Sequence, residues 1–593
     1  MQLIDFKKRF EAALKKHMDG HLRDAILDYK TILASQENNA DASYYLGTAY
    51  LQIGKIEDAI LWIQKSIKSN PNQPIALSNL GYCFNLSGKY KEAIKASADA
   101  LIFDKENDVA WTNLGNAQRG LGLKKEAQKS YENALKIQPN SAEYLYNLAN
   151  IFYESEDFET AKQLFKKSIE IDNKIAAVHT NLSACLAKQG LFSDALKHAL
   201  VSVQLEPADP EGWCNQANLL SRLNRHEEAL SSCQRAIDIK SDYAEAWVNR
   251  GDILSDLERL DEALASYDKA IALKINYADA FNHRGIVLGK LKRIDEALAS
   301  YDKSISIKAD YAEAFNNRGN ILRESFRLDD ALASYDKALF IKPSYTDALN
   351  NRGIVFKLLQ LFGRALADYR RVIELRPDFA EAWNNQGEVL KELERYDEAL
   401  ISYQRAIELK PDYAEAYSNR GVALGELRRY DEALTSYQRA IELRPDYADA
   451  HLNRALELLR IGKFQEAWNE HEWRLLSDDS KPAERHFPGQ VLIQEDLPKT
   501  GVMAIYAEQG LGDQILFSTL LPELKNSSQH FIYEVDERLL PVYQRSFPDC
   551  SFVGRISMTN TAHPALRDAG TAVYSGSLPR FFRPSVDSFS QQP

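Results

Sequence analysis

Apolar and small residues recur at helical spacing along most of the chain. In residues 380–413 a first set lies at i, i+4 and i+7, as Trp383, Gly387 and Leu390. A second set repeats this spacing, as Ala399, Tyr403 and Ala406. Each set falls on one face of a helix, and Pro411 ends the second helix because proline cannot continue it. The segment therefore predicts two helices that pack against each other.

One alanine of this pattern recurs every 34 residues without an insertion. The fourteen members of the series are Ala25, Ala59, Ala93, Ala127, Ala161, Ala195, Ala229, Ala263, Ala297, Ala331, Ala365, Ala399, Ala433 and Ala467. A fixed period of this length predicts a solenoid of stacked two-helix units. With the alanine at position 20, the units run from residue 6 to residue 481, and small residues at positions 8 and 20 let the two helices approach closely.

The pattern of the unit resembles the tetratricopeptide repeat. Its shared features are an aromatic residue and Gly at positions 4 and 8, Ala at 20, an aromatic residue at 24, Ala at 27 and Pro at 32. The resemblance covers residues 6–481 and implies an all-α superhelical solenoid. The last unit departs from the pattern after Ala467, as expected of a terminal cap, and Trp468 and Trp473 are expected to pack at this junction.

Position 6 of the unit carries an asparagine in eleven of the fourteen units. These residues, which we call the asparagine ladder, are Asn79, Asn113, Asn147, Asn181, Asn215, Asn249, Asn317, Asn351, Asn385, Asn419 and Asn453. Glu11, Tyr45 and His283 interrupt the series. Helix interiors disfavour asparagine, so its recurrence needs a cause. Position 6 is rotated away from the core positions 4 and 8, and such positions are expected on the concave wall.

Two interpretations of the ladder stay open. An amide both donates and accepts, so one asparagine per repeat can pair with the backbone of an extended peptide. Alternatively, each asparagine can bond the neighbouring repeat and stiffen the superhelix. The ladder is similar to that in the repeat domain of O-GlcNAc transferase, and this resemblance implies that the asparagines bind a protein or peptide in the concave groove.

Two further positions are charged in many units. Position 2 is mostly acidic, as in Glu245 and Glu381, and position 7 carries arginine in six units, including Arg352 and Arg420. These charges could select a basic or polar peptide. They could instead complement the helix dipole and bridge adjacent repeats.

The pattern changes after Pro482. Residues 502–508 and 530–535 predict strands, residues 514–525 and 536–547 predict helices, and short strands are expected near 551–555 and 571–576. This β-α-β-α order predicts a small, partial α/β, Rossmann-like lobe with a parallel sheet. The domains expected are thus residues 1–481, the solenoid, and residues 482–593, the lobe.

The lobe resembles the first half of two-lobed bacterial glycosyltransferases related to the heptosyltransferases. The resemblance rests on EHEWR (470–474), AEQGLGDQILFSTLLPEL (507–524), DERLLPVYQRSFP (536–548) and GSLPRFF (576–582). It implies that Gly510 and Gly512 form a ligand loop and that Asp513 is the catalytic base. From the residues alone, Asp513 could equally cap the helix that follows.

Only 112 residues follow Lys481, which is too few for a second lobe, where such enzymes hold the nucleotide-sugar. We therefore expect no cofactor and no turnover by this chain, and a nucleotide-sugar only if a second lobe exists. Three functions stay open: a peptide-binding scaffold with a truncated lobe, a protein glycosyltransferase or its fragment, and an assembly scaffold that binds partner helices.

The composition of the chain restricts the classes of partner that we expect. The net charge of −12 argues against a nucleic-acid binder, because phosphates need clustered cations. No apolar run is long enough for a membrane span. Five cysteines without a C-x-x-C pair predict free thiols in a reducing cytoplasm, and the scattered histidines predict no metal site.

Overall fold

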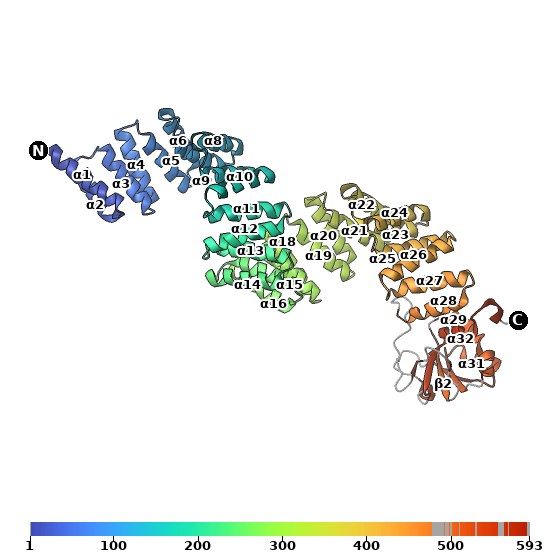
Figure 1. Ribbon diagram of the computed structural model, residues 1–593. Coiled ribbons are helices and arrows are strands. Elements are labelled where there is room, and N and C mark those ends of the chain that lie inside the picture. Colours follow the sequence, from blue (N-terminus) through green and yellow to red (C-terminus); the bar gives the residue numbers. More distant parts are fainter. Residues whose placement is uncertain are drawn as a thin grey trace. The chain divides into compact units, whose positions relative to one another are not determined.

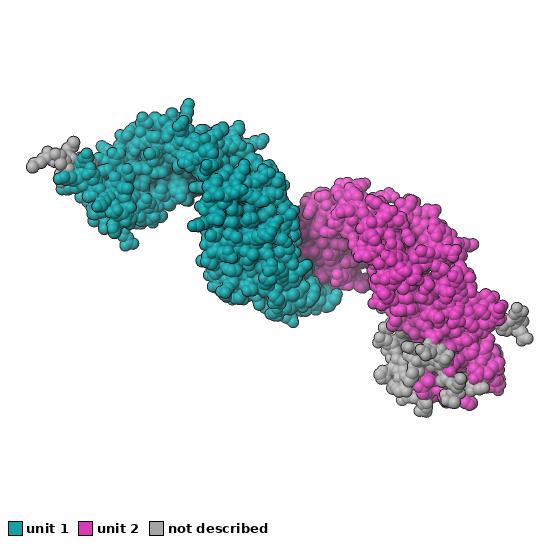
Figure 2. All heavy atoms as spheres, viewed as in Figure 1, with its two compact units in different colours: residues 1–308 teal, residues 309–593 magenta. Residues whose placement is uncertain are grey.

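The computed structural model describes residues 2–476, 491–492, 497, 501–508, 510–527, 530–555, 563–566 and 569–589. The chain forms two compact units, Met1–Lys308 and Ala309–Pro593 (Figure 2). The expected boundary at residues 481 and 482 lies outside the described residues and stays a prediction.

The first unit consists of helical hairpins (Figure 1). Its α-helices are α1(Gln2–Met18), α2(Leu22–Ser35), α3(Ala40–Gln52), α4(Ile56–Ser69), α5(Pro74–Leu86), α6(Tyr90–Phe103), α7(Asp108–Gly120), α8(Lys124–Ile137), α9(Ala142–Glu154), α10(Phe158–Ile171), α11(Ala176–Lys188), α12(Phe192–Leu205), α13(Pro210–Arg222), α14(His226–Ile239), α15(Ala244–Asp256), α16(Leu260–Leu273), α17(Ala278–Lys290) and α18(Ile294–Ile307). Two helices per 34 residues confirm the predicted repeat.

The second unit continues with the same hairpins and ends in a sheet. Its repeat helices are α19(Ala312–Glu324), α20(Leu328–Ile341), α21(Thr346–Leu358), α22(Phe362–Leu375), α23(Ala380–Glu392), α24(Tyr396–Leu409), α25(Ala414–Glu426), α26(Tyr430–Leu443), α27(Ala448–Arg460) and α28(Phe464–His471), followed by the 3-10 helix η1(Glu472–Leu475). None of the helices in the described part of the chain is long and apolar enough to cross a membrane.

Close helix packing explains the repeated small residues. All fourteen alanines at position 20 have an exposed fraction of 0%. At position 8, a Cβ added to Gly387 would lie 2.6 Å from the Tyr403 ring of the partner helix. The same clash would occur between Gly319 and Tyr335. Glycine at position 8 therefore makes room for the buried tyrosine at position 24, as the sequence predicts.

The two helices of a hairpin have different neighbours along each unit. First helices of successive hairpins, such as α5 and α7 or α21 and α23, pack against each other more closely than second helices do. Successive first helices therefore form a surface of their own in each unit, which we call the first-helix face.

The C-terminal sheet has five parallel strands in the order β1-β5-β2-β3-β4. The strands are β1(Val491–Leu492), β2(Val502–Tyr506), β3(His530–Val535), β4(Ser551–Gly554) and β5(Thr571–Tyr574). In register, Met503 of β2 pairs with Phe531 of β3 and with Thr571 of β5. Met503, Tyr533 and Val573 are buried in the core of this sheet. The predicted parallel sheet is confirmed.

The helices around the sheet are shorter than the sequence predicts. They are α29(Leu511–Ser518), α30(Leu521–Asn526), α31(Leu540–Ser546) and α32(Pro579–Phe582), with the 3-10 helices η2(Pro564–Leu566), η3(Ser575–Ser577) and η4(Val586–Ser588). The single helix predicted at 514–525 is wrong, because Pro522 cannot lie inside a helix and instead lies in the first turn of α30. Likewise Pro541 lies in the first turn of α31, so the helix predicted at 536–547 begins only at Leu540.

Candidate functional site on the first-helix face

Most asparagines of the ladder bond to the preceding repeat. In the second unit, Nδ2 of Asn385 donates to Oδ1 of Asn350 at 3.0 Å, and Nδ2 of Asn351 donates to Oδ1 of Asn316 at 3.1 Å. Asn419 donates in the same way to Asn384 at 3.1 Å. Each acceptor is the position-5 residue of the repeat before. The interpretation of the ladder as an internal staple is thus borne out for these residues.

The first unit uses the same staple with other acceptors. Nδ2 of Asn79 donates to Oη of Tyr44 at 2.9 Å, and Nδ2 of Asn181 donates to Oη of Tyr146 at 3.1 Å and to Oδ1 of Asn150 at 2.7 Å. Nδ2 of Asn113 donates to the backbone oxygen of Ser78 at 3.0 Å.

Cys214 is the position-5 residue of the repeat before Asn249. Burial raises the pKa of its thiol to about 12, and the nearby amide of Asn249 opposes this rise.

Burial varies along the ladder. Asn113 and Asn147 are buried, with exposed fractions of 3% and 9%, so the expectation that position 6 lies outside the core is wrong for them. Asn215, Asn317 and Asn453 are half-buried, as are the remaining asparagines of the ladder. The sequence contains a pattern from which these hydrogen bonds could have been predicted, because Asn316, Asn350 and Asn384 directly precede ladder asparagines.

The histidine that interrupts the ladder replaces the staple with an ion pair. Nδ1 of His283 lies 2.7 Å from Oδ1 of Asp252, in the preceding repeat. Burial alone would lower the pKa of His283, but the hydrogen bond and charge of Asp252 raise it above its usual value. Tyr267 Oη donates to the same carboxylate oxygen at 2.7 Å. Position 6 therefore joins neighbouring repeats even where asparagine is absent.

Two cavities open on the first-helix face of the first unit, and each includes a ladder asparagine. One has a volume of about 540 Å³ and lies between α1 and α3, with Tyr44, Tyr45 and Asn79 in its wall. The other, of about 530 Å³, lies among α9, α11, α12 and α13. Its wall includes Tyr153, Phe192, Asn215, Asn218, Lys188 and Arg222.

Family models match the repeats over more than half of the chain. Models described as TPR repeat or tetratricopeptide repeat match residues 19–74, 107–174, 210–243, 251–292, 282–346, 368–401, 387–428 and 414–447. The chain belongs to the tetratricopeptide repeat family. The resemblance seen in the sequence is confirmed for the repeats.

Solved structures of other tetratricopeptide proteins are similar to this chain at low scores. The structure described as the APC/C hetero-tetramer Cut9-Hcn1 has 13% identity and a TM-score of 0.41, covering 75% of this chain and 95% of that chain. The structure of YrrB, described as a TPR protein with an unusual peptide-binding site, has 27% identity and a TM-score of 0.27. That match covers 31% of this chain and 95% of the other. No curated protein sequence matches the chain.

The charged positions of the tetratricopeptide unit are paired internally. Position-2 acids bond position-31 bases of the same repeat, as Glu245 does with Lys274 at 3.0 Å and Glu415 with Arg444 at 2.8 Å. The position-7 arginine Arg352 pairs with Asp368 of its own repeat at 2.7 Å and with Asp336 of the preceding one at 2.6 Å. These contacts favour the structural interpretation of both positions.

The C-terminal sheet places the three predicted lobe residues at the start of α29. Gly510 precedes the helix with φ of +92°, a conformation that favours glycine. Gly512 and Asp513 lie exposed in the first turn. The helix begins after Gly510, and no side chain caps it, so the alternative that Asp513 is the cap is wrong. Gln509 of this loop lies outside the described residues.

An arginine from the end of the tetratricopeptide array lies at the carboxyl ends of β2 and β5. Nη2 and Nε of Arg474 donate to the two carboxylate oxygens of Glu508, at 2.7 and 3.0 Å. Nη2 also donates to Oγ of Ser577 at 2.9 Å, and the backbone N–H of Gly576 donates to Glu508 at 2.8 Å. Arg474 is only 4% exposed. Ligands of open parallel sheets bind outside the carboxyl ends of the strands, and here a protein side chain fills that place.

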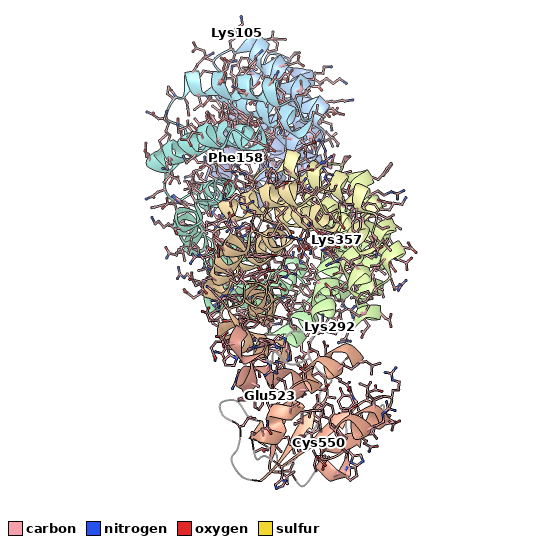
Figure 3. All side chains as sticks on the ribbon, turned by 90° about the vertical axis from the view of Figure 1, so that its right-hand side faces the viewer. Lys105, Phe158, Lys292, Lys357, Glu523 and Cys550 are labelled. Atoms are coloured by element: carbon pink, nitrogen blue, oxygen red, sulfur yellow. The ribbon has the colours of Figure 1, made fainter. Side chains whose placement is uncertain are left out.

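A further contact joins the last tetratricopeptide hairpin to the sheet region. The indole Nε1 of Trp468 donates to the backbone oxygen of Arg583 at 2.8 Å, which confirms its expected place at the junction. The Arg583 guanidinium donates to Glu523 of α30 at 2.7 Å, and Glu523 is labelled in Figure 3. The Trp473 ring stacks on His451 with centroids 4.0 Å apart. The sequence marked Arg474 as a departure from the repeat pattern, but its partner Glu508 lies 34 residues away and could not be found from the spacing.

Proposed function

We propose that this protein is a scaffold that binds an extended polypeptide along the first-helix face of its repeats. The observation that carries the proposal is the geometry of the staple. For Asn351, Asn385 and Asn419, the described hydrogen bonds use Nδ2 as the donor, and none of them uses Oδ1 as the acceptor. The staple fixes each amide plane while its carbonyl stays available for a peptide N–H.

The cavities of the first unit support the same proposal. Asn79 and Asn215 each lie in the wall of a cavity large enough for one or two peptide side chains. Lys188 and Arg222, in the wall of the second cavity, form no ion pair among the described residues. Aromatic and amide groups provide the remaining surface. Because the side chains of Lys188 and Arg222 are cationic, we expect the part of the polypeptide bound there to be polar or acidic.

The test compares two triple variants that break the same three amide–amide staples, although Asn419 keeps its hydrogen bond of 3.2 Å to Glu388 in the second. Asn351→Ala, Asn385→Ala and Asn419→Ala together remove the ladder amides. Asn316→Ala, Asn350→Ala and Asn384→Ala remove only the acceptors and leave those amides in place. A 12-residue peptide is first selected from a random display library on the full chain, and its affinity is then measured by fluorescence anisotropy.

We expect the first triple variant to weaken binding about tenfold or more, at roughly 0.5–1.5 kcal/mol per hydrogen bond. The second should retain binding within a few-fold although it loses the same staples. Equal losses in both would assign the ladder to stability alone. Unchanged binding in both would favour the third function considered, a scaffold for partner helices.

Protein glycosylation is the competing function of the C-terminal sheet region. It is favoured by the exposed carboxylate of Asp513 beside the end of β2, in the loop that resembles a glycosyltransferase. It is opposed by Arg474, which fills the place outside β2 and β5 where a ligand would enter. Calorimetric titration of UDP-N-acetylglucosamine into the full chain tests whether the C-terminal sheet region binds a nucleotide-sugar. We expect no saturable heat of binding. Saturable binding that Asp513→Asn abolishes would instead favour sugar transfer as the function of this region.

A further inference from the structure

Several position-7 arginines that lie between repeats have a carboxylate partner, whereas Arg250 donates to Oγ of Ser266 at 2.6 Å. Arg352 pairs with Asp336 and Asp368, and Arg284 pairs with Asp268 at 2.7 Å. Burial alone would lower the pKa of Arg352, but its hydrogen bonds to the two aspartates raise it. The carboxylate thus compensates for the removal of the guanidinium from water.

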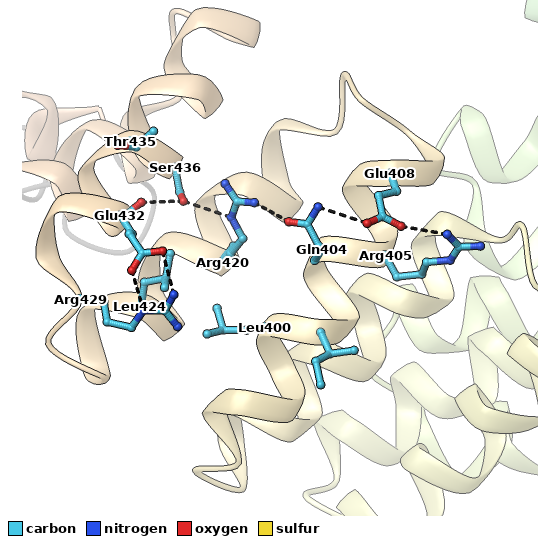
Figure 4. A pocket seen from close by; sticks show the side chains of 11 residues that line it. Leu400, Gln404, Arg405, Glu408, Arg420, Leu424, Arg429, Glu432, Thr435 and Ser436 are labelled. Atoms are coloured by element: carbon cyan, nitrogen blue, oxygen red, sulfur yellow. Dashed lines mark hydrogen bonds and ion pairs between the residues drawn. The ribbon is translucent and has the colours of Figure 1, made fainter.

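Arg420 occupies the same position but has only neutral partners. Its Nη1 donates to Oε1 of Gln404 at 2.8 Å and its Nε donates to Oγ of Ser436 at 3.1 Å (Figure 4). Gln404 stands where the preceding repeats have Asp336 or Asp268. Burial lowers the pKa of Arg420, and the nearby charge of Glu432 offsets this only in part. Among the ion pairs of the described residues, none includes Arg420.

A cavity of about 540 Å³ lies beside this guanidinium, between α24, α25 and α26. Leu400, Ile401 and Leu424 form its apolar part, and the Ile401 side chain is 68% exposed. The other charges of the wall are paired with each other. Arg405 bonds Glu408 at 2.9 Å and Arg429 bonds Glu432 at 2.7 Å, as the dashed lines in Figure 4 show. Arg420 is therefore the one cation of this wall without an acidic partner.

We propose that this cavity binds the side-chain carboxylate of an aspartate or glutamate on a partner protein, with Arg420 as its counter-ion. A carboxylate can accept two parallel hydrogen bonds from a guanidinium, and this pairing is stronger than a neutral hydrogen bond. Ile401 and Leu400 provide contact for an aliphatic residue next to the acid. The surface lies against the second helices α24 and α26, so it is separate from the asparagine ladder and does not depend on it.

The chain offers a sharp test, because neighbouring repeats already contain the missing carboxylate. Gln404→Asp reproduces the arrangement of Asp336 with Arg352 and should neutralise Arg420 from within. Arg420→Gln removes the cation. Arg439→Gln is the matched control, since Arg439 is an exposed arginine of α26 that pairs with Glu442 at 3.0 Å and lies outside the cavity wall.

The probes are two peptides, Ac-Gly-Leu-Glu-Leu-Glu-Gly-amide and the same peptide with glutamine for both glutamates. Binding to the full chain is followed by the methyl resonance of Ile401, assigned through Ile401→Val. We expect saturable shifts with the glutamate peptide, and at least about tenfold weaker binding of the glutamine peptide. Gln404→Asp and Arg420→Gln should each reduce glutamate-peptide binding about tenfold or more. Arg439→Gln should leave it unchanged.

Three results would overturn the proposal: no shift with the glutamate peptide, equal binding of both peptides, or full binding by Gln404→Asp. A second measurement needs no ligand. Gln404→Asp should raise the protection of α25 amides against hydrogen exchange, because it supplies the counter-charge, and unchanged or lower protection would show that Arg420 needs no acidic partner.

Discussion

Nδ2 of Asn385 donates a hydrogen bond of 3.0 Å to Oδ1 of Asn350, which lies 35 residues earlier in the chain. The same relation joins Asn351 to Asn316 and Asn419 to Asn384. A stripe that could have been a ligand surface alone is therefore also a series of contacts between repeats. A test of the ladder must therefore separate its contribution to stability from its contribution to binding.

The staple should have a measurable coupling energy. We expect Asn350→Ala and Asn385→Ala each to lower the local opening free energy around α21 and α23 by about 1 kcal/mol, because each removes one partner of the bond. The double variant should cost less than the sum of the two, with a coupling of roughly 0.5–1.5 kcal/mol. Amide exchange of α21 and α23 measures the three values, and strict additivity would show that the bond contributes nothing.

Glycine at position 8 should be intolerant of any side chain. A Cβ at Gly387 would lie 2.6 Å from the Tyr403 ring, so Gly387→Ala should destabilise its repeat by about 1–3 kcal/mol. Gly363 of α22 is the matched control, because a Cβ there would have no atom within 4 Å. Gly363→Ala should stabilise its helix by roughly 0.5–1 kcal/mol. Chemical denaturation followed by circular dichroism should move the two midpoints in opposite directions.

The His283–Asp252 pair should make the stability of its repeats depend on pH. The folded pKa of His283 is raised, so its contribution is fully present below the unfolded pKa of about 6.5 and is lost as pH rises through the folded pKa. Protection of α15 and α17 amides, corrected for intrinsic exchange, should therefore fall over this range. His283→Asn restores the residue found elsewhere in the ladder and should remove this dependence. An identical pH profile in both proteins would contradict the assignment.

The buried pair of Arg474 and Glu508 should hold the C-terminal sheet region onto the last hairpin. Glu508→Gln removes the bidentate partner of a guanidinium that is 4% exposed and leaves it only Glu472 at 2.9 Å, so the loss should approach but not exceed the about 3–5 kcal/mol of a broken buried pair. Limited proteolysis should then cleave between the repeats and β2 much faster than in the parent protein. Asp549→Asn is the control, since its pair with Lys525 is exposed and is expected to contribute less than about 1 kcal/mol. Equal cleavage rates in all three proteins would refute this role.

The sequence predicted the repeats well because their determinants are local and repeated. The spacing of Trp383, Gly387 and Leu390 defines the face of the first helix, and Pro411 follows the end of the second, wherever the unit lies in the chain. The short strands near Val502 and His530 were likewise found from a few neighbouring residues. The helices beside the sheet were overestimated, because Pro522 and Pro541 restrict where a helix can begin.

The sequence by itself determined the 34-residue period, the two-helix unit and the stripe of asparagines, since each follows from residues within one or two helical turns. Only the tertiary structure decided what those residues touch. Asn385 meets Asn350 and Arg420 meets Gln404 because stacked repeats bring together side chains far apart along the chain. Arg474 meets Glu508 because the sheet packs on the last hairpin. Such contacts depend on how one unit is rotated on the next, and no local pattern encodes that rotation.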